Sequence, residues 1–391
     1  MLITKQKELD ALCARLSGEE FITIDTEFLR EKTYYPKLCL VQLCGPDGKP
    51  VAIDPLEGDL DLSPLFALLE NEKVLKIFHA ARQDLEIFYH MTGKVVHPFF
   101  DTQIAAMVLG HGEQVGYEAL VRNITGAQID KSVQFTNWAH RPLSQKQIDY
   151  ALGDVTHLLD VYRKLSDDLA WRGRTSWVFE EEAVLEDPAT YQNNPDEVWK
   201  RIKLRSPKPK MLAILKALAA WRERRAQDRD IPKSWVMRDE TLADMAAQAP
   251  KDADGLKKIR GMSADLAAGH VGKEILKVIK EAAATPKEDW PQAVKKKPMP
   301  PTTAAVVDAL KMLLKIQCGM SDVAAKLVAS ADDLEEIAVK GEDADVPALK
   351  GWRREVFGET ALQFKQGKLA IGLKDSKIVK YDVSHETNTV K

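Results

Sequence analysis

The sequence predicts an α/β domain, a mixed sheet flanked by helices, followed by two all-α domains. Three observations predict this arrangement. Short runs rich in Val, Ile, Leu and Phe are confined to residues 1–175, where helical patterns follow them. Beyond that point only helical spacing of apolar residues remains, and no strand is expected there. A segment rich in Pro and Lys, residues 286–302, divides the helical part in two.

The N-terminal part is expected to form the sheet and the helices beside it. The first three predicted strands are joined only by turn-length connections, so they should be antiparallel neighbours. The helical patterns that follow predict helices on the faces of the sheet. The predicted strands are residues 21–27, 38–44, 51–54 and 74–79, and the predicted helices are residues 81–91, 102–109 and 144–165.

The C-terminal half is expected to be a diverged helical repeat, because Met245 recurs as Ile337 and Gly272 recurs as Gly358 at similar spacings. The alternative is that two unrelated helical bundles share these matches. Helices are predicted within residues 210–227, 241–248, 273–284 and 303–364. The predicted domains are residues 1–205, residues 206–285, a linker at 286–302, and residues 303–391, which include a tail after about residue 370 with no assigned function.

Composition places the chain among ordinary globular proteins, with 45% hydrophobic and 29% charged residues. No apolar run of about 18 residues occurs, so no membrane span is expected. The 4 cysteines lack CxxC spacing, which predicts a reducing, cytoplasmic setting rather than a disulfide framework.

The net charge is −3, yet residues 205–285 contain 17 basic and 11 acidic residues. This unevenness favours a polyanion-binding part, although ordinary scatter is the alternative.

Asp25 and Glu27 lie two apart on the first predicted strand, so both carboxylates should project from one face. Two neighbouring acids repel each other, and a divalent cation or a proton relieves that repulsion. Carboxylate oxygens are the ligands that hard cations such as Mg²⁺ prefer. The alternative is that the strand ends at Ile24 and both acids lie in solvent.

Tyr150 and Asp154 lie four apart on the predicted helix at residues 144–165, which puts them on one helical face. The alternative is an exposed pair on the helix surface. A further acid, Asp84, follows the fourth strand and could stabilise a helix N-terminus through the helix dipole. Asp101 is predicted to cap the next helix, and His79 to pack or hydrogen-bond at the end of its strand.

The order and context of these acids resemble the ribonuclease D family, within the DEDD superfamily of 3′→5′ exonucleases. Residues 74–88 and 130–159 carry the resemblance most strongly. The family's three acidic motifs are matched by Asp25-Thr26-Glu27, by Asp84, and by Tyr150 with Asp154. In the other branch of the superfamily a His lies five residues before the last Asp, and here that position is Asp149. The resemblance therefore implies the Tyr branch and a ribonuclease H-like α/β fold. The upstream pattern that favours ribonuclease D comprises Lys131, Ser132, Gln134, Trp138, Arg141, Pro142 and Leu143.

The resemblance implies a metal-dependent 3′→5′ exoribonuclease that trims RNA 3′ ends and releases nucleoside 5′-monophosphates. Two divalent ions, Mg²⁺ or Mn²⁺, are implied as cofactors. Asp25 would bridge both ions, Glu27 and Asp154 would hold the ion that activates water, and Asp84 would help hold the other. Tyr150 would orient the attacking water, because a phenol with a pKa near 10 is a poor base at neutral pH. Thr26 and Phe28 are candidates for the wall that binds the terminal nucleotides, although core burial of Phe28 is an equal alternative.

The resemblance extends to the helical half. Residues 206–285 are similar to the HRDC domain, residues 303–370 are similar to a diverged second copy, and family members use such modules to hold nucleic acid. Trp221 and Trp235 could stack on bases, although a solvated charged face with both tryptophans in the core is the alternative. The basic residues expected to contact phosphates are Arg222, Arg224, Arg225, Arg229, Lys257, Lys258 and Arg260.

The expected partner is RNA with a single-stranded 3′ end, tRNA precursors in particular, with no membrane and no obligate protein partner. Two rivals remain. One is a DNA 3′→5′ exonuclease of the proofreading type. The other is a nucleic-acid-binding scaffold with an inactive nuclease domain, against which the four intact acids argue.

Overall fold

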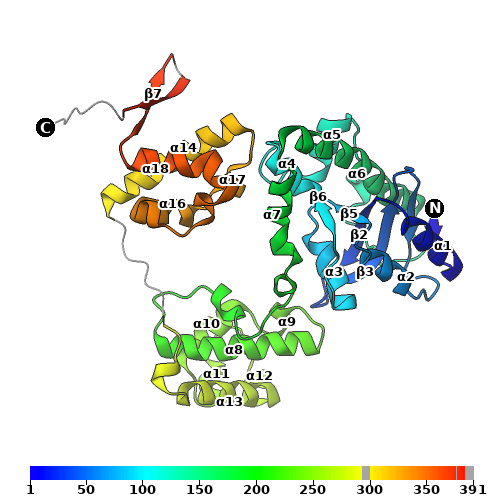
Figure 1. The fold of residues 1–391 in the computed structure, drawn as a ribbon. Helices are drawn as coiled ribbons and strands as arrows, with labels where there is room; N and C mark the ends of the chain where they lie inside the picture. Colours follow the sequence, from blue (N-terminus) through cyan, green and yellow to red (C-terminus); the bar gives the residue numbers. More distant parts are fainter. Residues whose placement is uncertain (293–299, 376, 384–391) are drawn as a thin grey trace.

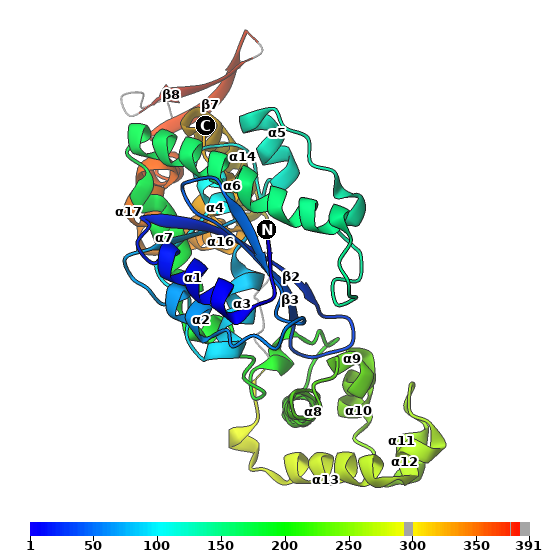
Figure 2. The ribbon, with the colours of Figure 1, turned by 90° about the vertical axis from the view of Figure 1, so that its right-hand side faces the viewer.

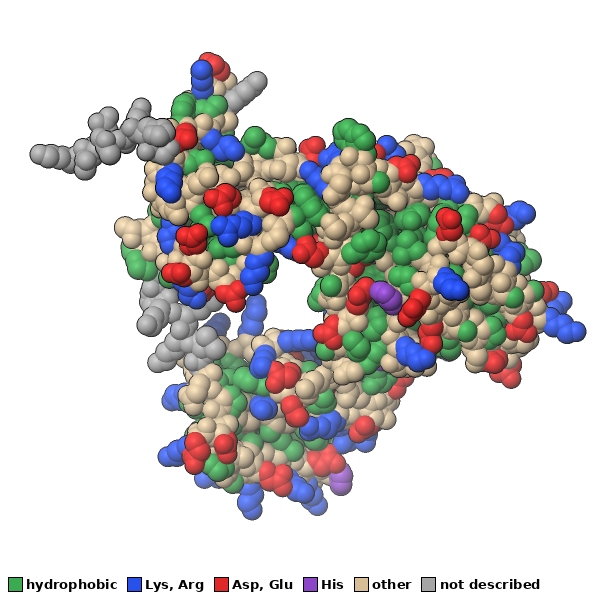
Figure 3. Space-filling model, viewed as in Figure 1, with side chains coloured by type: hydrophobic (Ala, Val, Ile, Leu, Met, Phe, Trp, Pro, Cys, Tyr) green, Lys and Arg blue, Asp and Glu red, His purple; other side chains and the backbone are tan. Residues whose placement is uncertain are grey.

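The computed structural model describes residues 1–292, 300–375 and 377–383. Figure 1 shows three bodies, an α/β body and two helical bodies, and Figure 3 shows an opening between them. The middle of the predicted linker, with its three consecutive lysines, and the end of the predicted tail lie outside the described residues. Within the described part of the chain, no helix is both long enough and apolar enough to cross a bilayer.

The α/β body contains a six-stranded mixed sheet of order β1-β4-β3-β2-β5-β6. β2 pairs with β3 and β3 with β4 in antiparallel fashion, which confirms the prediction from the short connections. The β1–β4, β2–β5 and β5–β6 pairs are parallel. The strands are β1 (Leu2–Ile3), β2 (Phe21–Leu29), β3 (Lys37–Cys44), β4 (Pro50–Ile53), β5 (Leu75–Phe78) and β6 (Phe99–Asp101).

Helices cover both faces of this sheet (Figure 2). On one face, Ile22 and Ile24 of β2 pack with apolar residues of α1, α2 and α3. On the other face, Thr23 donates a hydrogen bond from its hydroxyl to the carbonyl of Val155 on α6, at 2.7 Å. The alternation along β2 therefore turns Asp25 and Glu27 toward α6. The helices are α1 (Gln6–Leu16), α2 (Ser63–Leu69), α3 (Arg82–Thr92), α4 (Thr102–Val108), α5 (Tyr117–Thr125), α6 (Gln145–Arg172) and α7 (Thr175–Glu186).

The first helical body has its own apolar core, in which Leu215, Leu242 and Ile275 are fully buried. Its long helices α8 and α13 pack against each other, and α10 packs on α8. This confirms the helices predicted in residues 210–284. The elements are α8 (Pro209–Asp228), α9 (Lys233–Val236), α10 (Asp239–Gln248), α11 (Ala253–Lys257), α12 (Ala264–Ala268) and α13 (His270–Ala284).

The second helical body repeats a packing feature of the first. A Cβ on Gly272 would lie 2.0 Å from the carbonyl oxygen of Ala267, and one on Gly358 would lie 2.4 Å from that of Ala348. In both bodies a helix therefore approaches a preceding backbone segment where only glycine fits. The elements are α14 (Pro301–Ser321), α15 (Ala325–Val328), α16 (Ala331–Lys340), α17 (Gly351–Arg353), a π-turn at Arg354–Gly358 and α18 (Glu359–Lys365).

The prediction that strands end near residue 175 is wrong. β7 (Leu369–Lys374) and β8 (Lys377–Asp382) form an antiparallel hairpin in the predicted tail. Apolar residues recur in both segments at the spacing of two that strands favour, including Ile371 and Leu373 of β7. The short strands β1 and β6 were also missed, because two or three residues are too few to show a period.

The second helical body docks on the α/β body through α7. Trp177 stacks on Trp352 with ring centroids 4.3 Å apart and planes 10° apart. Arg353 pairs with Glu181, and Arg174 donates to the carbonyl of Ser321 at 2.6 Å. These contacts join residues far apart in the sequence and hold the second body beside the sheet.

Candidate metal and catalytic site

Three carboxylates converge between the sheet and α6. Asp25 and Glu27 come from β2 and Asp154 from α6, and one oxygen of each lies within 4.8 Å of the others. Asp154 is buried, while Asp25 and Glu27 are half-buried. The alternative that these strand acids lie in solvent is therefore wrong. Period two on the strand puts Asp25 and Glu27 on one face, whereas the approach of Asp154 from α6 was implied only by the family resemblance.

Asp84 adjoins this cluster without belonging to it. It lies in the first turn of α3, is buried, and accepts a hydrogen bond from the hydroxyl of Thr26. The backbone leading into α3 is held by Asp101, whose carboxylate accepts from the N–H groups of Ala80 and Ala81, both at 2.9 Å. Asp101 also accepts from Gln103 as the N-cap of α4, which confirms the capping prediction.

Asp25, Glu27 and Asp154 line a cavity of about 200 Å³. Tyr150 forms part of its wall, one helical turn from Asp154, and its ring lies 6.2 Å from that of Trp138. Tyr117 of α5 donates its hydroxyl to the carbonyl of Asp154. The lining residues are Asp25, Thr26, Glu27, His79, Tyr117, Gln134, Tyr150, Asp154 and Leu158.

Burial disfavours negative charge throughout the cluster. It raises the pKa of Asp25 to about 6 and that of Asp154 to about 8. Burial, together with the charges of Asp25, Asp154 and Asp84, raises the pKa of Glu27 to about 10. The pKa of Asp84 also lies well above its usual range, because of burial and then the charge of Asp25. The cluster therefore favours any cation that can reach it.

The donor set fits a divalent cation. All the converging atoms are carboxylate oxygens, which suit Mg²⁺ and Mn²⁺. Asp154 Oδ1 is buried without a hydrogen-bond partner among the described residues. Gln42, which faces Asp25 across the β2–β3 pair, is fully buried, and neither end of its amide has a partner in the described part of the chain. Buried polar groups left unsatisfied are costly, and an ion bound at the cluster would satisfy Asp154 Oδ1.

Burial also raises the pKa of Tyr150 further above its usual range, and the charge of Asp154 adds to this effect. Its hydroxyl therefore stays protonated at neutral pH and can donate or accept a hydrogen bond without acting as a base.

The segment that covers Tyr150 is anchored by Arg141. Its guanidinium forms a bidentate pair with the fully buried Asp54, with N···O distances of 2.5 and 2.6 Å. It also donates to the carbonyl of Trp138 at 2.7 Å. The indole of Trp138 in turn donates to the carbonyl of Gln134 at 3.2 Å, and Gln134 lines the cavity. The sequence pattern included these residues without indicating what they contact.

The two residues predicted for the nucleotide wall have different positions. Thr26 lines the cavity. Phe28 is half-buried and packs against the core on the opposite face of the sheet, after a register shift between Glu27 and Phe28.

His79 forms a hydrogen bond with Thr102 as predicted, at 3.0 Å, and also lines the cavity. Tyr117 was missed, because nothing in the sequence shows that α5 folds back onto α6.

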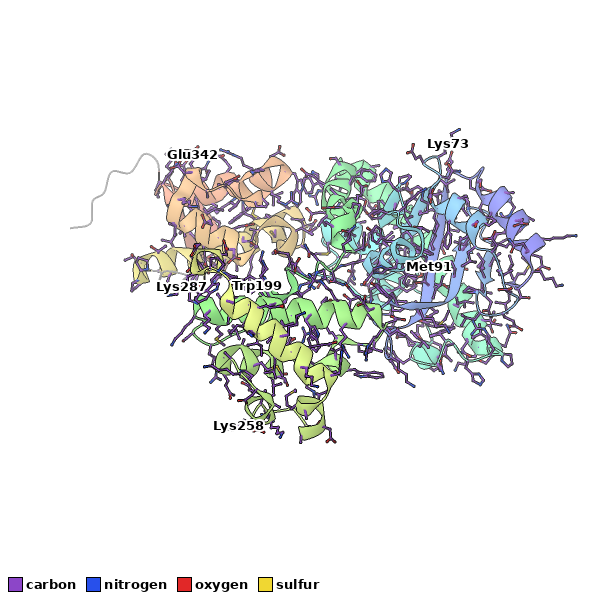
Figure 4. All side chains as sticks on the ribbon, turned by 90° about the horizontal axis from the view of Figure 1, so that it is seen from below. Lys73, Met91, Trp199, Lys258, Lys287 and Glu342 are labelled. Carbon is purple, nitrogen blue, oxygen red and sulfur yellow. The ribbon has the colours of Figure 1, made fainter. Side chains whose placement is uncertain are left out.

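A second hollow lies in the first helical body, between α8 and α13. Trp221, Arg224, Arg229 and Lys277 line it. Lys258 lies at the outer edge of this body (Figure 4). The prediction that Arg222 contacts phosphate is wrong: it is 3% exposed and bonds to the carbonyl of Met237 and the carboxylate of Asp239.

The tryptophans of this body differ in exposure. Trp221 is half-buried against the core, whereas Trp235 is 61% exposed. The alternative that both tryptophans are core residues is therefore wrong for Trp235.

Comparisons with known proteins agree with this architecture. A family model described as 3′-5′ exonuclease matches residues 1–170, and one described as HRDC domain matches residues 211–279. A ribonuclease D from Nitrobacter hamburgensis is 46% identical over 384 residues, which cover 98% of this chain and 100% of the relative. A ribonuclease D from Gluconacetobacter diazotrophicus is 47% identical over 378 residues, 97% of this chain and 96% of the relative.

A solved structure is similar over nearly the whole chain. The crystal structure of Escherichia coli RNase D, described as an exoribonuclease involved in structured RNA processing, has a TM-score of 0.80. The identity is 30%, and the match covers 94% of this chain and 98% of the other. The likeness therefore includes the helical bodies as well as the α/β body.

Proposed function

The chain belongs to the ribonuclease D family and is a 3′→5′ exoribonuclease, and on that premise we propose that it trims single-stranded 3′ ends of RNA, including those of tRNA precursors, with two divalent ions. Enzymes with this exonuclease fold depend on divalent metal. The observation that carries the proposal is the convergence of Asp25, Glu27 and Asp154 within 4.8 Å, beside the buried Asp84. Three acids that line one cavity, with a fourth acid buried beside them, repel one another unless cations are bound.

Each site residue has a proposed role. Asp25 belongs to the cluster with Glu27 and Asp154, and its charge also acts on Asp84, so it would share both ions. Glu27 and Asp154 would hold one of these ions, and Asp84 the other. Two bound ions would activate a water and stabilise the charge on the leaving oxygen.

Tyr150 would orient that water by a hydrogen bond, and Thr26 would help bind the terminal nucleotide while it holds Asp84. Water adds to phosphorus, the bond to the 3′ oxygen breaks, and that oxygen takes up a proton. The product is a nucleoside 5′-monophosphate.

The helical bodies would hold the RNA behind the site. The match to the HRDC model covers most of the first body, and the shared glycine contacts support a diverged second copy at residues 303–370. The domain limits at 205, 285 and 302 stay predictions, and Val198 and Ile202, which precede residue 205, are buried in the core of the first helical body. The cytoplasmic location, predicted from the cysteines, stays a prediction.

The test is incubation of the protein with a 3′-tailed RNA and with a DNA of the same sequence. We expect stepwise shortening of the RNA from its 3′ end, loss of activity in EDTA, and recovery with Mg²⁺ or Mn²⁺. Asp25→Ala should be inactive. Shortening that persists in EDTA or in Asp25→Ala would contradict the proposal. Preferential cleavage of the DNA would favour the proofreading rival.

A further inference from the structure

The loop between β2 and β3, residues 30–36, follows the strand that carries Asp25 and Glu27, and it is tied to the helix that carries Asp84. Arg30 forms a bidentate pair with Glu86 of α3, with N···O distances of 3.0 and 2.8 Å. Glu86 lies two residues after Asp84. The ring of Tyr35 packs edge-on against His90, also of α3, with centroids 4.6 Å apart. The β2–β3 loop thus links β2, which carries Asp25 and Glu27, to α3, which carries Asp84.

The first helical body also forms hydrogen bonds with this loop. Tyr34 donates its hydroxyl to Glu223 of α8 and accepts a bond from Gln227, at 3.3 Å. Asp230, just after α8, accepts from the backbone N–H groups of both Tyr34 and Tyr35, each at 3.0 Å. Tyr34 is 8% exposed and Glu223 is 1% exposed. In Figure 2 the loop end of β2 and β3 approaches the helices of this body.

We propose that Tyr34 is a positioning residue through which the first helical body sets the geometry of the catalytic carboxylates. Resting on the proposed function, this gives that body a role in the chemical step as well as in holding RNA. Tyr34 is hydrogen-bonded to α8. Its neighbours in the loop contact α3, and the loop begins directly after β2. A shift of the loop would therefore move Asp25 and Glu27 relative to Asp84. Misplacement of catalytic groups by about 1 Å can reduce turnover by about 100-fold.

The competing interpretation is that these contacts only tether the helical body. The two interpretations differ for a substrate too small to reach α8, such as the p-nitrophenyl ester of uridine 5′-monophosphate. If the contacts only tether, turnover of this small ester should not depend on Tyr34. If Tyr34 positions the carboxylates, turnover of the ester should fall with little change in its KM.

The first experiment compares Tyr34→Phe with wild type on the small ester and on a long single-stranded RNA. We expect kcat to fall about tenfold on both substrates, because a buried hydrogen-bonded pair is broken. Tyr191→Phe is the matched control, since that buried hydroxyl donates to Leu185 within the α/β body and touches neither α8 nor the loop. Unchanged kcat on the ester, with a raised KM for the RNA only, would overturn the proposal.

The second experiment uses Asp230, whose φ of 47° favours Gly and Asn over other replacements. Asp230→Gly removes the acceptor for the two loop N–H groups and should lower kcat on the ester. Asp230→Asn keeps an acceptor, so its kcat on the ester should be close to that of the wild type. Equal kcat in both variants would count against the proposal.

A third measurement, the rise in Tm caused by Mn²⁺, separates this proposal from the proposed function. We expect a smaller rise in Tyr34→Phe than in wild type or Tyr191→Phe, because displaced carboxylates bind the ion less well. If wild type cleaves neither substrate, the proposed function fails, and the Mn²⁺ shift still decides the role of Tyr34. An equal shift in all three proteins would then contradict it.

Discussion

At the residue scale, the site is a set of acids whose mutual repulsion the fold tolerates. Asp25, Glu27 and Asp154 each have a pKa raised by burial, to about 6, 10 and 8. Each carboxyl therefore binds a proton more tightly in the folded chain than in the unfolded chain. Their contribution to stability is present at low pH and is lost as pH rises through the folded pKa values.

The direction of these pKa shifts predicts how the stability of Asp25→Asn depends on pH in the absence of metal. At pH 8 the variant should be more stable than wild type by about 1–3 kcal/mol, because one repelling charge is gone. The difference should shrink toward zero near pH 5, where Asp25 takes up its proton. Thermal or urea unfolding in EDTA measures the difference, and Asp167→Asn, an exposed acid of α6, is the control. A variant less stable than wild type at pH 8 would contradict the repulsion.

Tyr150 offers a second test at this scale. Tyr150→Phe should slow turnover by about 100-fold, since the water loses its orienting hydroxyl, with little change in RNA affinity. Single-turnover rates and RNA titrations would measure the two effects separately. Tyr162→Phe is the control on the same helix, because that ring packs on Phe21 and Phe100. Equal turnover in wild type and Tyr150→Phe would refute the role.

The acids could be found from the sequence because their order and context match the motifs of the family, and the local period of a strand or a helix adds support for Asp25 with Glu27 and for Asp154 with Tyr150. Gln42 and Tyr117 could not, because their importance depends on which strand or helix they face after folding. Arg222 was assigned to the surface for a related reason. A basic residue on a helix next to other basic residues looks exposed in the sequence, and only the packing of α8 shows that it is buried.

At the element scale, the long helices and the central strands follow from apolar periodicity, and most of their predicted ends lie close to those in the structure, with α6 as an exception. α6 extends to Arg172, well past the predicted end at residue 165, because its later turns still bury Leu165 and Leu169. The hairpin β7–β8 was missed because it lies after a long helical region, so its pattern had no predicted partner.

The glycine contact in the second helical body yields a stability test. Gly358→Ala should destabilise this body by about 1–3 kcal/mol, because the new methyl group would meet the carbonyl of Ala348. Gly319→Ala is the matched control in α14 of the same body, since a Cβ there meets nothing within 4 Å. Hydrogen exchange across residues 303–364 would measure the local effect. Equal protection in the two variants would contradict the close approach.

At the scale of the whole molecule, two helical bodies are held against one catalytic body by different contacts. The first body forms a hydrogen bond with Tyr34 of the β2–β3 loop through Glu223. In the second body, Trp352 stacks on Trp177 of α7. The sequence predicted the three bodies from composition and the Pro-rich segment. It could not predict their arrangement, because the contacts between them join single residues more than a hundred positions apart.

The hollow between α8 and α13 provides a test of RNA binding by the first body. Replacing Arg224, Arg229 and Lys277 with Ala should weaken binding of structured RNA and reduce the slope of log affinity against log salt by about 0.7 for each lost phosphate contact. Cleavage of the small ester should not change. Lys200→Ala, Lys311→Ala and Lys350→Ala together make the control, because they remove three cations outside this hollow. An unchanged slope would dismiss RNA contact there.

The central claim is that four acids from β2, α3 and α6 hold two divalent ions where the terminal phosphodiester is cleaved. Anomalous diffraction from crystals soaked in Mn²⁺ tests it most directly. The account predicts two peaks about 3.5–4 Å apart, with Asp25 touching both, Glu27 and Asp154 touching one, and Asp84 beside the other. Peaks elsewhere, or none at these carboxylates under saturating Mn²⁺, would contradict it.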